Sequence, residues 1–392
     1  MCRASRLNSR RSSCTGKGKR DGPAVSGFEL KGARRATRPT PGKRIARALR
    51  WAFVPGLMVA CGWYVTGMPG DSWSGPLPPL SAQQRLIRDK LQSHVGALAG
   101  RIGERNVWRP EALAAAADYI RVTLEDLGYA VRDQSFLSEG VEVANLEVEL
   151  PGHLVPREII VLGAHYDSAP GTPGANDNAS GVAALLEIAR LLAGQRYTRS
   201  VRLVAFANEE PPFFYTEAMG SAVYAARARR RGERIEAMLA LETLGWYTDQ
   251  PGSQRYPFPF SLFYPDRGNF VGFVGNLPAR GLVRRALAAF RASTQFPSEG
   301  VAAPGGMEGV HWSDHWSFWQ AGYPAIMITD TALFRYPHYH AATDTPERLD
   351  YPSLARVTLG LAEVVAALAA KTGSERNGTY LRPNPLFQLA LT

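Results

Sequence analysis

The stretch EIIVLGAHYDS, residues 158–168, decides how this chain folds. It begins as a run of Ile, Val and Leu without polar alternation and ends in His165, Tyr166 and Asp167. A continuous apolar run of this kind is typical of a strand that is covered on both faces of a parallel sheet. Open α/β sheets bind their ligands beyond the carboxyl ends of such strands. The stretch therefore predicts a buried strand with a polar site at its end.

Similar runs surround this stretch, and helical spacing of apolar residues separates them. This alternation predicts an α/β fold with a mostly parallel central sheet and helices on both faces. No internal repeat is present, which excludes a solenoid. The other strand candidates are 143–150, 200–208, 237–245, 269–275 and 324–331, and the helix candidates are 110–127, 180–194, 217–232, 278–292 and 352–371, with a first helix starting near residue 81.

Charge is distributed unevenly along the 392 residues, whose formal net charge is +10. The first 50 residues carry 15 Lys and Arg against Asp21 and Glu29, so the rest of the chain is slightly acidic. A nucleic-acid partner needs a basic patch on the folded domain, so we expect none. The three cysteines, Cys2, Cys14 and Cys61, all lie near the N-terminus. Any metal site in the body must therefore use oxygen and nitrogen ligands.

The N-terminal region predicts a membrane attachment. We expect a disordered basic arm over residues 1–45 and a transmembrane anchor over 46–67, because the apolar run WAFVPGLMVACGWYVTG at 51–67 follows a basic stretch. The positive arm would stay in the cytoplasm and the folded domain would lie outside, periplasmic or extracellular, on a single-pass cell-membrane protein. A cleaved signal peptide, a lipoprotein site ending at Cys61 and a buried core helix are alternatives.

The remaining segments complete the predicted domain organisation. The Pro/Gly-rich residues 68–80 are typical of a linker. The main folded domain over 81–375 and a tail over 376–392 follow.

Acids and histidines gather where the predicted strands end. Taken singly, each has an ordinary explanation: a strand-end His is usually structural, and an Asp before a helix can be an N-cap. Several acids at the ends of apolar strands are costly unless a cation neutralises them. Together they predict a metal site of the nitrogen and oxygen type that zinc accepts. The candidates are His165, Asp167, Asp177, Glu209, Glu210, Glu242 and His340.

The motifs HYDS, GANDNASG, NEE, LETLG, SDHWSFW and HYHAATDT occur in this order between residues 165 and 345. In order and spacing the chain resembles the zinc aminopeptidases of metallopeptidase family 28, which are related to glutamate carboxypeptidase and glutaminyl cyclase. The resemblance covers roughly residues 85–370. It implies an exopeptidase that hydrolyses N-terminal residues of peptides with a water activated by two zinc ions.

The resemblance also implies a role for each candidate. One zinc ion would be held by His165, Asp177 and Glu242, and the other by Asp177, Glu210 and His340. Many members carry Asp where this chain has Glu242, whose carboxylate reaches one methylene further. The remaining implied roles are Glu209 as general base, Asp167 as the residue that orients His165, and Asp314 and His315 as lining of the substrate pocket.

Two other functions remain open at this point. A glutaminyl cyclase-like acyltransferase would use one zinc ion, so metal stoichiometry separates it from a peptidase. A non-catalytic domain that kept the fold is disfavoured because all five ligands and the base are present. The chain has neither a G-x-S-x-G elbow nor an H-E-x-x-H helix, which excludes an α/β-hydrolase and a thermolysin-like peptidase.

Overall fold

The structure is a computed structural model, and it describes residues 41–370. The chain divides into two compact units, Met1–Gly56 and Leu57–Thr392. The described residues of the first unit belong to helix α1, Pro41–Thr66, which also contributes the start of the second. Most of the predicted basic arm, and the predicted tail over 376–392, lie outside the described residues.

The second unit is built on an eight-stranded sheet with the order β1-β2-β4-β3-β5-β8-β6-β7. Strand β3 pairs in parallel with β4 and β5, β5 with β8, and β6 with β7, whereas the pairs β1-β2, β2-β4 and β6-β8 are antiparallel. The prediction of a mostly parallel central sheet is confirmed. The strands are β1 Arg132–Ser138, β2 Val141–Leu150, β3 Val155–His165, β4 Arg199–Phe206, β5 Arg234–Glu242, β6 Val271–Asn276, β7 Ser298–Ala303 and β8 Ala325–Thr329.

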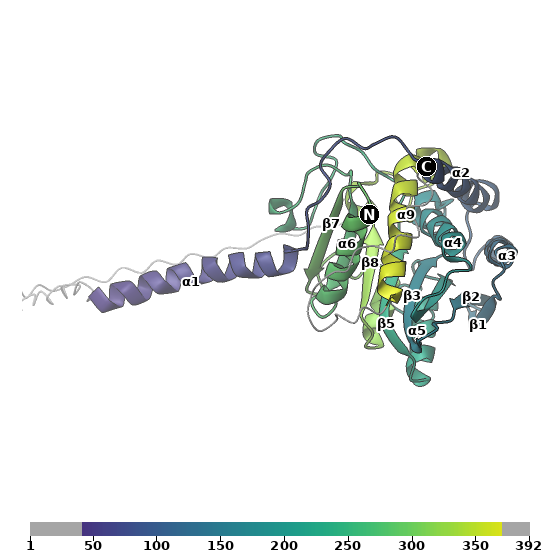
Figure 1. The fold of residues 1–392 in the computed structure, drawn as a ribbon, viewed down its shortest axis with the longest axis horizontal. Helices are drawn as coiled ribbons and strands as arrows, with labels where there is room; N and C mark the ends of the chain where they lie inside the picture. Colours follow the sequence, from purple (N-terminus) through teal and green to yellow (C-terminus); the bar gives the residue numbers. More distant parts are fainter. Residues whose placement is uncertain (1–40, 371–392) are drawn as a thin grey trace, which may run out of the picture. The chain divides into compact units, whose positions relative to one another are not determined.

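Helices cover both faces of this sheet. Figure 1 shows α4, α6 and α9 across one face, and α5 and α7 contact β2, β5 and β8 from the other. The α-helices of the body are α2 Ala82–Val95, α3 Pro110–Asp126, α4 Gly181–Leu192, α5 Gly220–Arg230, α6 Arg280–Ser293, α7 His315–Gln320, α8 Ala332–Arg335 and α9 Tyr351–Ala369.

Alternation along β3 shows why its apolar run is continuous. Ile160 and Leu162 belong to the large core cluster beneath α4 and α9, whereas Ile159 and Val161 belong to the cluster on the α5 and α7 side. Successive strand residues face opposite sides of a sheet, so a strand covered on both faces must be apolar throughout.

Among the described residues, helix α9 is long and apolar enough to cross a membrane. However, 72% of its apolar stretch is buried inside the body. It is therefore a core helix. The predicted anchor over 46–67 overlaps α1, in which Gly56–Thr66 is an apolar stretch shorter than a membrane span. That this segment anchors the chain in a membrane stays a prediction.

Candidate metal centre

The predicted ligands come from the ends of three adjacent strands and from two loops. His165 is the last residue of β3, Glu242 is the last residue of β5, and Glu209 and Glu210 follow β4 closely. Because β3 lies between β4 and β5 and runs parallel to both, these carboxyl ends meet at one edge of the sheet. The structure thus brings His165 and Glu242 together, although they are 77 positions apart in the chain.

Asp177 divides its carboxylate between the two histidines. Its Oδ1 lies 3.3 Å from Nε2 of His165, and its Oδ2 lies 3.1 Å from Nε2 of His340. Nε2 of His165 is also 3.3 Å from Oε2 of Glu242, and Nε2 of His340 is 3.2 Å from Oε2 of Glu210. The five side chains therefore form two sets of three that share Asp177.

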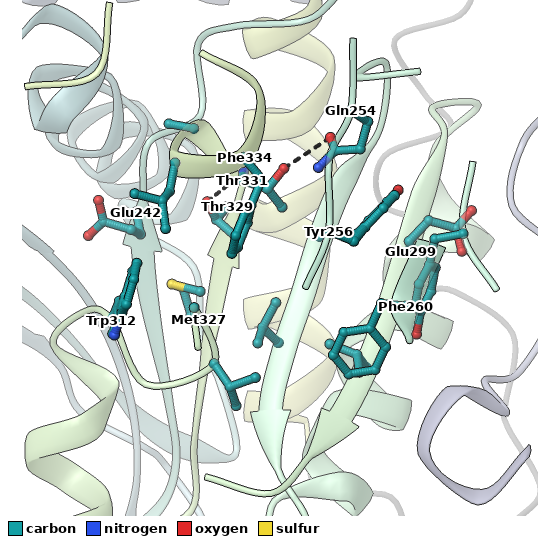
Figure 2. A pocket seen from close by; sticks show the side chains of 18 of the residues that line it. Glu242, Gln254, Tyr256, Phe260, Glu299, Trp312, Met327, Thr329, Thr331 and Phe334 are labelled. Atoms are coloured by element: carbon teal, nitrogen blue, oxygen red, sulfur yellow. Dashed lines mark hydrogen bonds between the residues drawn. The ribbon is translucent and has the colours of Figure 1, made fainter. Parts of the chain in front are cut away.

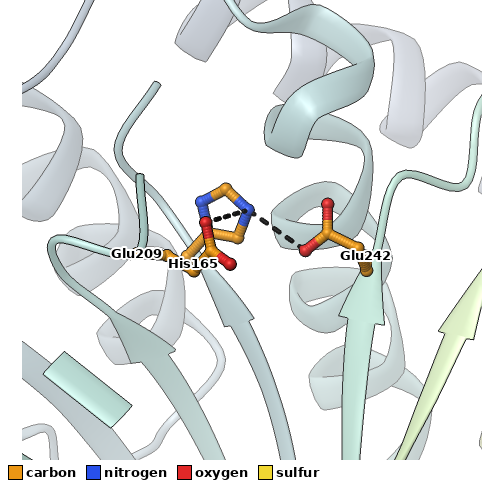
Figure 3. A group of neighbouring side chains, drawn as sticks. All are labelled: His165, Glu209 and Glu242. Carbon is orange, nitrogen blue, oxygen red and sulfur yellow. Dashed lines mark ion pairs between the residues drawn. The ribbon is translucent and has the colours of Figure 1, made fainter. Parts of the chain in front are cut away.

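Glu209 lies slightly further from this cluster. Its Oε2 is 3.8 Å from Nε2 of His165, whereas the same nitrogen is 3.3 Å from Glu242 (Figure 3). Ligand atoms of His165, Glu209 and Glu242 all lie within 4.8 Å of one another, so distance alone would let Glu209 join a metal. Of the three acids beside Nε2 of His165, Glu209 makes the longest contact.

Asp167 orients the two adjacent glutamates. Its Oδ1 accepts the backbone N–H of Glu209 at 3.0 Å, and its Oδ2 accepts that of Glu210 at 3.1 Å. Oδ1 is also 3.4 Å from Nδ1 of His165, which makes no hydrogen bond. Asp167 thus lies beside His165, as predicted, but its hydrogen bonds fix the backbone that carries the acids. The sequence did not indicate this second contact.

Burial and like charge raise the pKa values of the acids in the cluster. Burial, followed by repulsion from Glu242 and Glu210, raises the pKa of Glu209 well above its usual value. Burial and Asp177 raise the pKa of Glu210 to about 7, and burial also raises the pKa of Glu242. These carboxyl groups are expensive to ionise together without a cation.

Burial acts on the pKa values of the histidines in the opposite sense, but the neighbouring acids outweigh it. Burial lowers the pKa of His340, but Asp177 and Glu210 overcome this effect and raise it to about 10. For His165, burial is likewise outweighed by Glu209 and Glu242, so its pKa lies well above the usual value. The negative potential that favours protons on these rings would equally favour a divalent cation.

The donor set fits zinc. Nδ1 and Nε2 of His165 and Oδ1 of Asp177 are buried and make no hydrogen bond, although Nε2 and Oδ1 are only 3.3 Å apart. Buried polar atoms normally have partners. Nε2 of His165 and Oδ1 of Asp177 face each other without a hydrogen bond, an arrangement that fits two ligands of one cation. Imidazole nitrogen and carboxylate oxygen are ordinary zinc ligands.

The loop that carries Asp177 is fixed by a buried residue that we did not predict. Oδ1 of Asp344 accepts the backbone N–H of Asn176 at 2.9 Å, and Oδ2 accepts that of Asp177 at 3.1 Å. The Tyr336 hydroxyl donates to Asp344 at 2.8 Å. Asp344 belongs to the HYHAATDT motif, so its position in the motif was the available signal.

Arg105 is a second positioning residue, and its side chain is fully buried. Its guanidinium donates to the carbonyl oxygens of Tyr166 at 2.7 Å, Pro173 at 2.6 Å and Gly174 at 2.9 Å. It thereby joins the segment after β3 to the segment before Asp177. No signal in the sequence distinguished Arg105 from the many other arginines.

A largely apolar cavity of about 110 Å³ opens beside Glu242. Figure 2 shows Glu242 and Trp312 at one end of the cavity, with Tyr256 and Phe260 further along it. Tyr339, the neighbour of His340, also lines it. Among these lining residues only Glu242 was a predicted site residue, because aromatic residues in loops carry no distinctive spacing.

The two residues predicted to line the substrate pocket lie deeper than expected. Asp314 and His315 are both fully buried and do not line this cavity. Nε2 of His315 contacts the carbonyl oxygen of Val310 at 2.8 Å, and burial lowers its pKa to about 4. Both oxygens of Asp314 lack a hydrogen-bond partner, and burial raises its pKa to about 7.

Comparison with known families and sequences gives a consistent result. A model of peptidase family M28 matches residues 145–365. The uncharacterized protein YfbL of Escherichia coli K12 is 40% identical over 298 residues, which are 74% of this chain and 90% of that protein. A probable zinc metalloprotease of Pyrenophora teres f. teres is 28% identical over 66% of this chain, which spans only 58% of that relative.

Solved structures share the fold at low sequence identity. A zinc aminopeptidase from Bacillus subtilis has a TM-score of 0.55 at 16% identity and covers 72% of this chain and 95% of its own. A glutaminyl cyclase from Fimbriiglobus ruber has a TM-score of 0.56 at 20% identity, covering 75% and 98%. At these identities the likeness concerns the fold alone.

Proposed function

Because the chain belongs to peptidase family M28 and is a zinc peptidase by that membership, we propose that it is an aminopeptidase with two zinc ions. The substrate would be a peptide with a free α-amino group, shortened by one residue at a time. The carboxylate of Asp177, with one oxygen toward each histidine, is the observation that supports this proposal. A carboxylate shared in this way suits a pair of metal ions.

The five ligands are assigned as the two sets that share Asp177. His165 and Glu242 would hold one ion, and Glu210 and His340 the other. When bound, two such ions supply an activated water and polarise the scissile carbonyl. The other steps fall to residues of the chain itself.

Glu209 would take the proton of the attacking water and pass it to the leaving amine. A general base must lie within reach of the water without being occupied as a ligand, and Glu209 makes the longest contact of the three acids beside Nε2 of His165. Burial holds its pKa well above the usual value, which favours proton uptake during turnover. Asp167 would act as a positioning residue, since it fixes the backbone N–H groups of Glu209 and Glu210.

The cavity beside Glu242 supports a preference for an apolar N-terminal side chain. Aromatic residues such as Tyr256 and Phe260 line it, and apolar engineered cavities of about 150 Å³ bind molecules the size of benzene. The acids clustered at the Glu242 end would attract the substrate ammonium group. Asp314, an initial candidate for that contact, is fully buried and would need to become accessible first.

We further propose that α1 anchors the chain in the cell membrane with the peptidase domain outside. The basic arm before the apolar run supports this topology through the preference of positive segments for the cytoplasm. The peptide substrate and the membrane are then the two expected partners.

Replacing the two adjacent glutamates tests the peptidase mechanism. We expect Glu209→Gln to keep the zinc content and lose about 10² to 10⁴-fold in kcat, because the amide cannot accept a proton. Glu210→Gln should instead lower the zinc content. Zinc loss in the Glu209 variant with full zinc in the Glu210 variant would reverse the two assignments.

A panel of peptides tests the reaction class. Peptides with a free N-terminus should be cleaved, and their N-acetylated forms should not. Equal rates on both forms would refute the aminopeptidase proposal. Cyclisation of an N-terminal glutamine without peptide cleavage would instead identify a glutaminyl cyclase-like enzyme, the alternative that the second fold neighbour suggests.

A further inference from the structure

The loop between β5 and β6 carries an exposed group of large apolar side chains. Its residues 256–265, YPFPFSLFYP, contain no charge between Arg255 and Asp266. Phe258 is 81% exposed, Leu262 is 71% exposed and Phe263 is 50% exposed. We call these three side chains the apolar tip. Scattered exposed apolar residues are common, but a contiguous group usually marks an interaction site.

The inner side of the same loop holds the apolar tip in place. The rings of Tyr256 and Tyr264 lie 5.8 Å apart, and those of Phe260 and Tyr264 lie 6.1 Å apart. The Tyr264 hydroxyl donates to the carbonyl oxygen of Gly300 in β7 at 2.7 Å. Phe260 is buried, so the loop is already packed on the body while its tip projects outward.

The apolar tip is continuous with the exposed end of α1. A Cβ atom added to Gly62 would lie 3.1 Å from the ring of Phe263, so the loop and the helix end are in contact. Trp63 is 71% exposed and Tyr64 is 49% exposed beside this contact. The aromatic surface therefore runs from the segment we assign to the membrane directly onto the peptidase domain.

Arginines of α6 border this surface. The guanidinium of Arg280 lies 4.3 Å from the centre of the Tyr64 ring, and its Nε donates to the Tyr64 carbonyl oxygen at 2.7 Å. Arg284 donates to the carbonyl oxygen of Gly67, and Arg285 next to it is exposed. Aromatic side chains beside arginines are typical of the level of lipid headgroups, where both the apolar and the charged parts are accommodated.

We propose that the apolar tip inserts into the interfacial layer of the bilayer that α1 enters, with the arginines of α6 facing anionic headgroups. This inference rests on the membrane anchoring in the proposed function. The occupant is a lipid surface because the tip is contiguous with the anchor helix and basic groups border it. An amphipathic surface of this composition binds through its buried apolar area and through attraction to anionic lipids.

The inferred contact has a consequence for substrate access. Tyr256, Phe260 and Tyr264, on the inner side of the loop, line the cavity beside Glu242. The loop that meets the lipid is therefore also a wall of the proposed substrate site. Peptides that carry an apolar N-terminal residue and collect at the membrane surface would be the favoured substrates.

Site-directed fluorescence in the full-length protein tests this inference. Cys2, Cys14 and Cys61 are replaced by serine, and single cysteines are introduced by Phe258→Cys and Leu262→Cys and labelled with an environment-sensitive dye. Leu137→Cys is the matched control, because Leu137 is 74% exposed in β1 at the opposite edge of the sheet. The protein is reconstituted into vesicles of phosphatidylcholine and phosphatidylglycerol with nitroxide-labelled lipid.

The dye at positions 258 and 262 should shift to the blue and be quenched several-fold more strongly by the nitroxide lipid than the dye at position 137. Equal weak quenching by lipid at all three positions would overturn the proposal. Shielding of position 258 from both lipid and aqueous iodide would also overturn it, in favour of a protein partner.

Two controls on the same vesicles separate this result from other failures. Retention after carbonate extraction reports on the anchor, and cleavage of a soluble free peptide reports on the peptidase function. Normal cleavage without lipid quenching would reject the membrane contact alone, whereas quenching without cleavage would reject the proposed activity alone.

Discussion

Replacement of Arg105 by Gln should destabilise the metal centre from a distance. The Arg105 guanidinium is fully buried and donates to four carbonyl oxygens, which belong to Gly103, Tyr166, Pro173 and Gly174. Pro173 and Gly174 shortly precede Asp177 in the chain, and Tyr166 directly follows His165. The side chain therefore holds together the two segments that present the shared ligand and its neighbour.

The expected magnitude follows from the number of lost donors. A glutamine amide at position 105 could serve at most two of the four carbonyls, and a hydrogen bond to a charged group contributes about 1.5 to 3 kcal/mol. The loss of two gives about 3 to 6 kcal/mol. Burial of the Arg105 charge is unfavourable and lowers the pKa of Arg105 to about 10. The variant no longer buries this charge, which reduces the sum. We expect a decrease of about 3 to 5 kcal/mol in the free energy of unfolding.

Arg121→Gln provides a matched control. Arg121 forms a bidentate pair with Asp133 at 2.7 and 2.8 Å, and the two side chains are 27% and 40% exposed. Exposed ion pairs contribute about 0 to 1 kcal/mol, so this variant should be close to wild type. Both variants remove one arginine charge and differ in burial.

Urea unfolding of the metal-free protein, followed by a zinc titration, measures both effects. The Arg105 variant should unfold at lower urea and bind zinc more weakly, while Arg121→Gln should do neither. An Arg105 variant within about 1 kcal/mol of wild type would refute the reasoning, because buried hydrogen bonds would then not hold the ligand segments.

Three further predictions follow from the site and the N-terminal region. Zinc affinity should rise as pH increases from 6 to 8, because a proton must leave His340 before a metal binds. Burial lowers the pKa of His340, but Asp177 and Glu210 outweigh burial and raise it to about 10. Calorimetry in two buffers should detect the released proton, and a pH-independent affinity would contradict this prediction. Ser313→Ala should weaken zinc binding about 10 to 100-fold, since the Ser313 hydroxyl donates to Glu242 at 2.8 Å; Ser317→Ala, which removes a hydroxyl paired with Ser221, should leave zinc binding unchanged. Protease added to intact spheroplasts should digest the peptidase domain and spare the N-terminal arm; a body degraded only after lysis would reverse the proposed topology.

The strands next to the site were predictable because burial on both faces imposes a simple pattern. The runs that became β3, β4, β5 and β8 contain few polar residues, and ligands mark the ends of the first three. Two strands were missed. β1, RDQSFLS, is largely exposed at the sheet edge, and β7, SEGVAA, is short and partly polar, so neither shows the apolar run that identifies a central strand.

The ligand positions were also predictable, because strand order places the carboxyl ends of parallel strands together. The contacts that hold the ligand segments in place were not predictable. Arg105 acts on carbonyls up to 69 residues away, and Asp344 acts on backbone groups 167 and 168 residues away. Such bonds engage the main chain, so neither the partner's residue type nor its spacing reveals them.

Residues 68–80 show why composition alone does not predict the contacts of a segment. Their composition is typical of a linker, yet Arg291 donates to the carbonyls of Pro69 and Gly70, and Ser72 accepts the backbone N–H of Ser298. Arg291 of α6 thus holds the start of this segment through its backbone carbonyls. The composition of a segment indicates its backbone flexibility when it is isolated. It does not indicate which residues of the folded domain bind the segment and fix it.

Anomalous diffraction at the zinc edge, on crystals of the full-length protein grown with zinc, tests the central claim most directly. We expect two peaks, one on each side of the Asp177 carboxylate and about 3.5 to 4 Å apart, with His165 and Glu242 at one peak and Glu210 and His340 at the other. A single peak at full occupancy, or a peak ligated by Glu209, would contradict it.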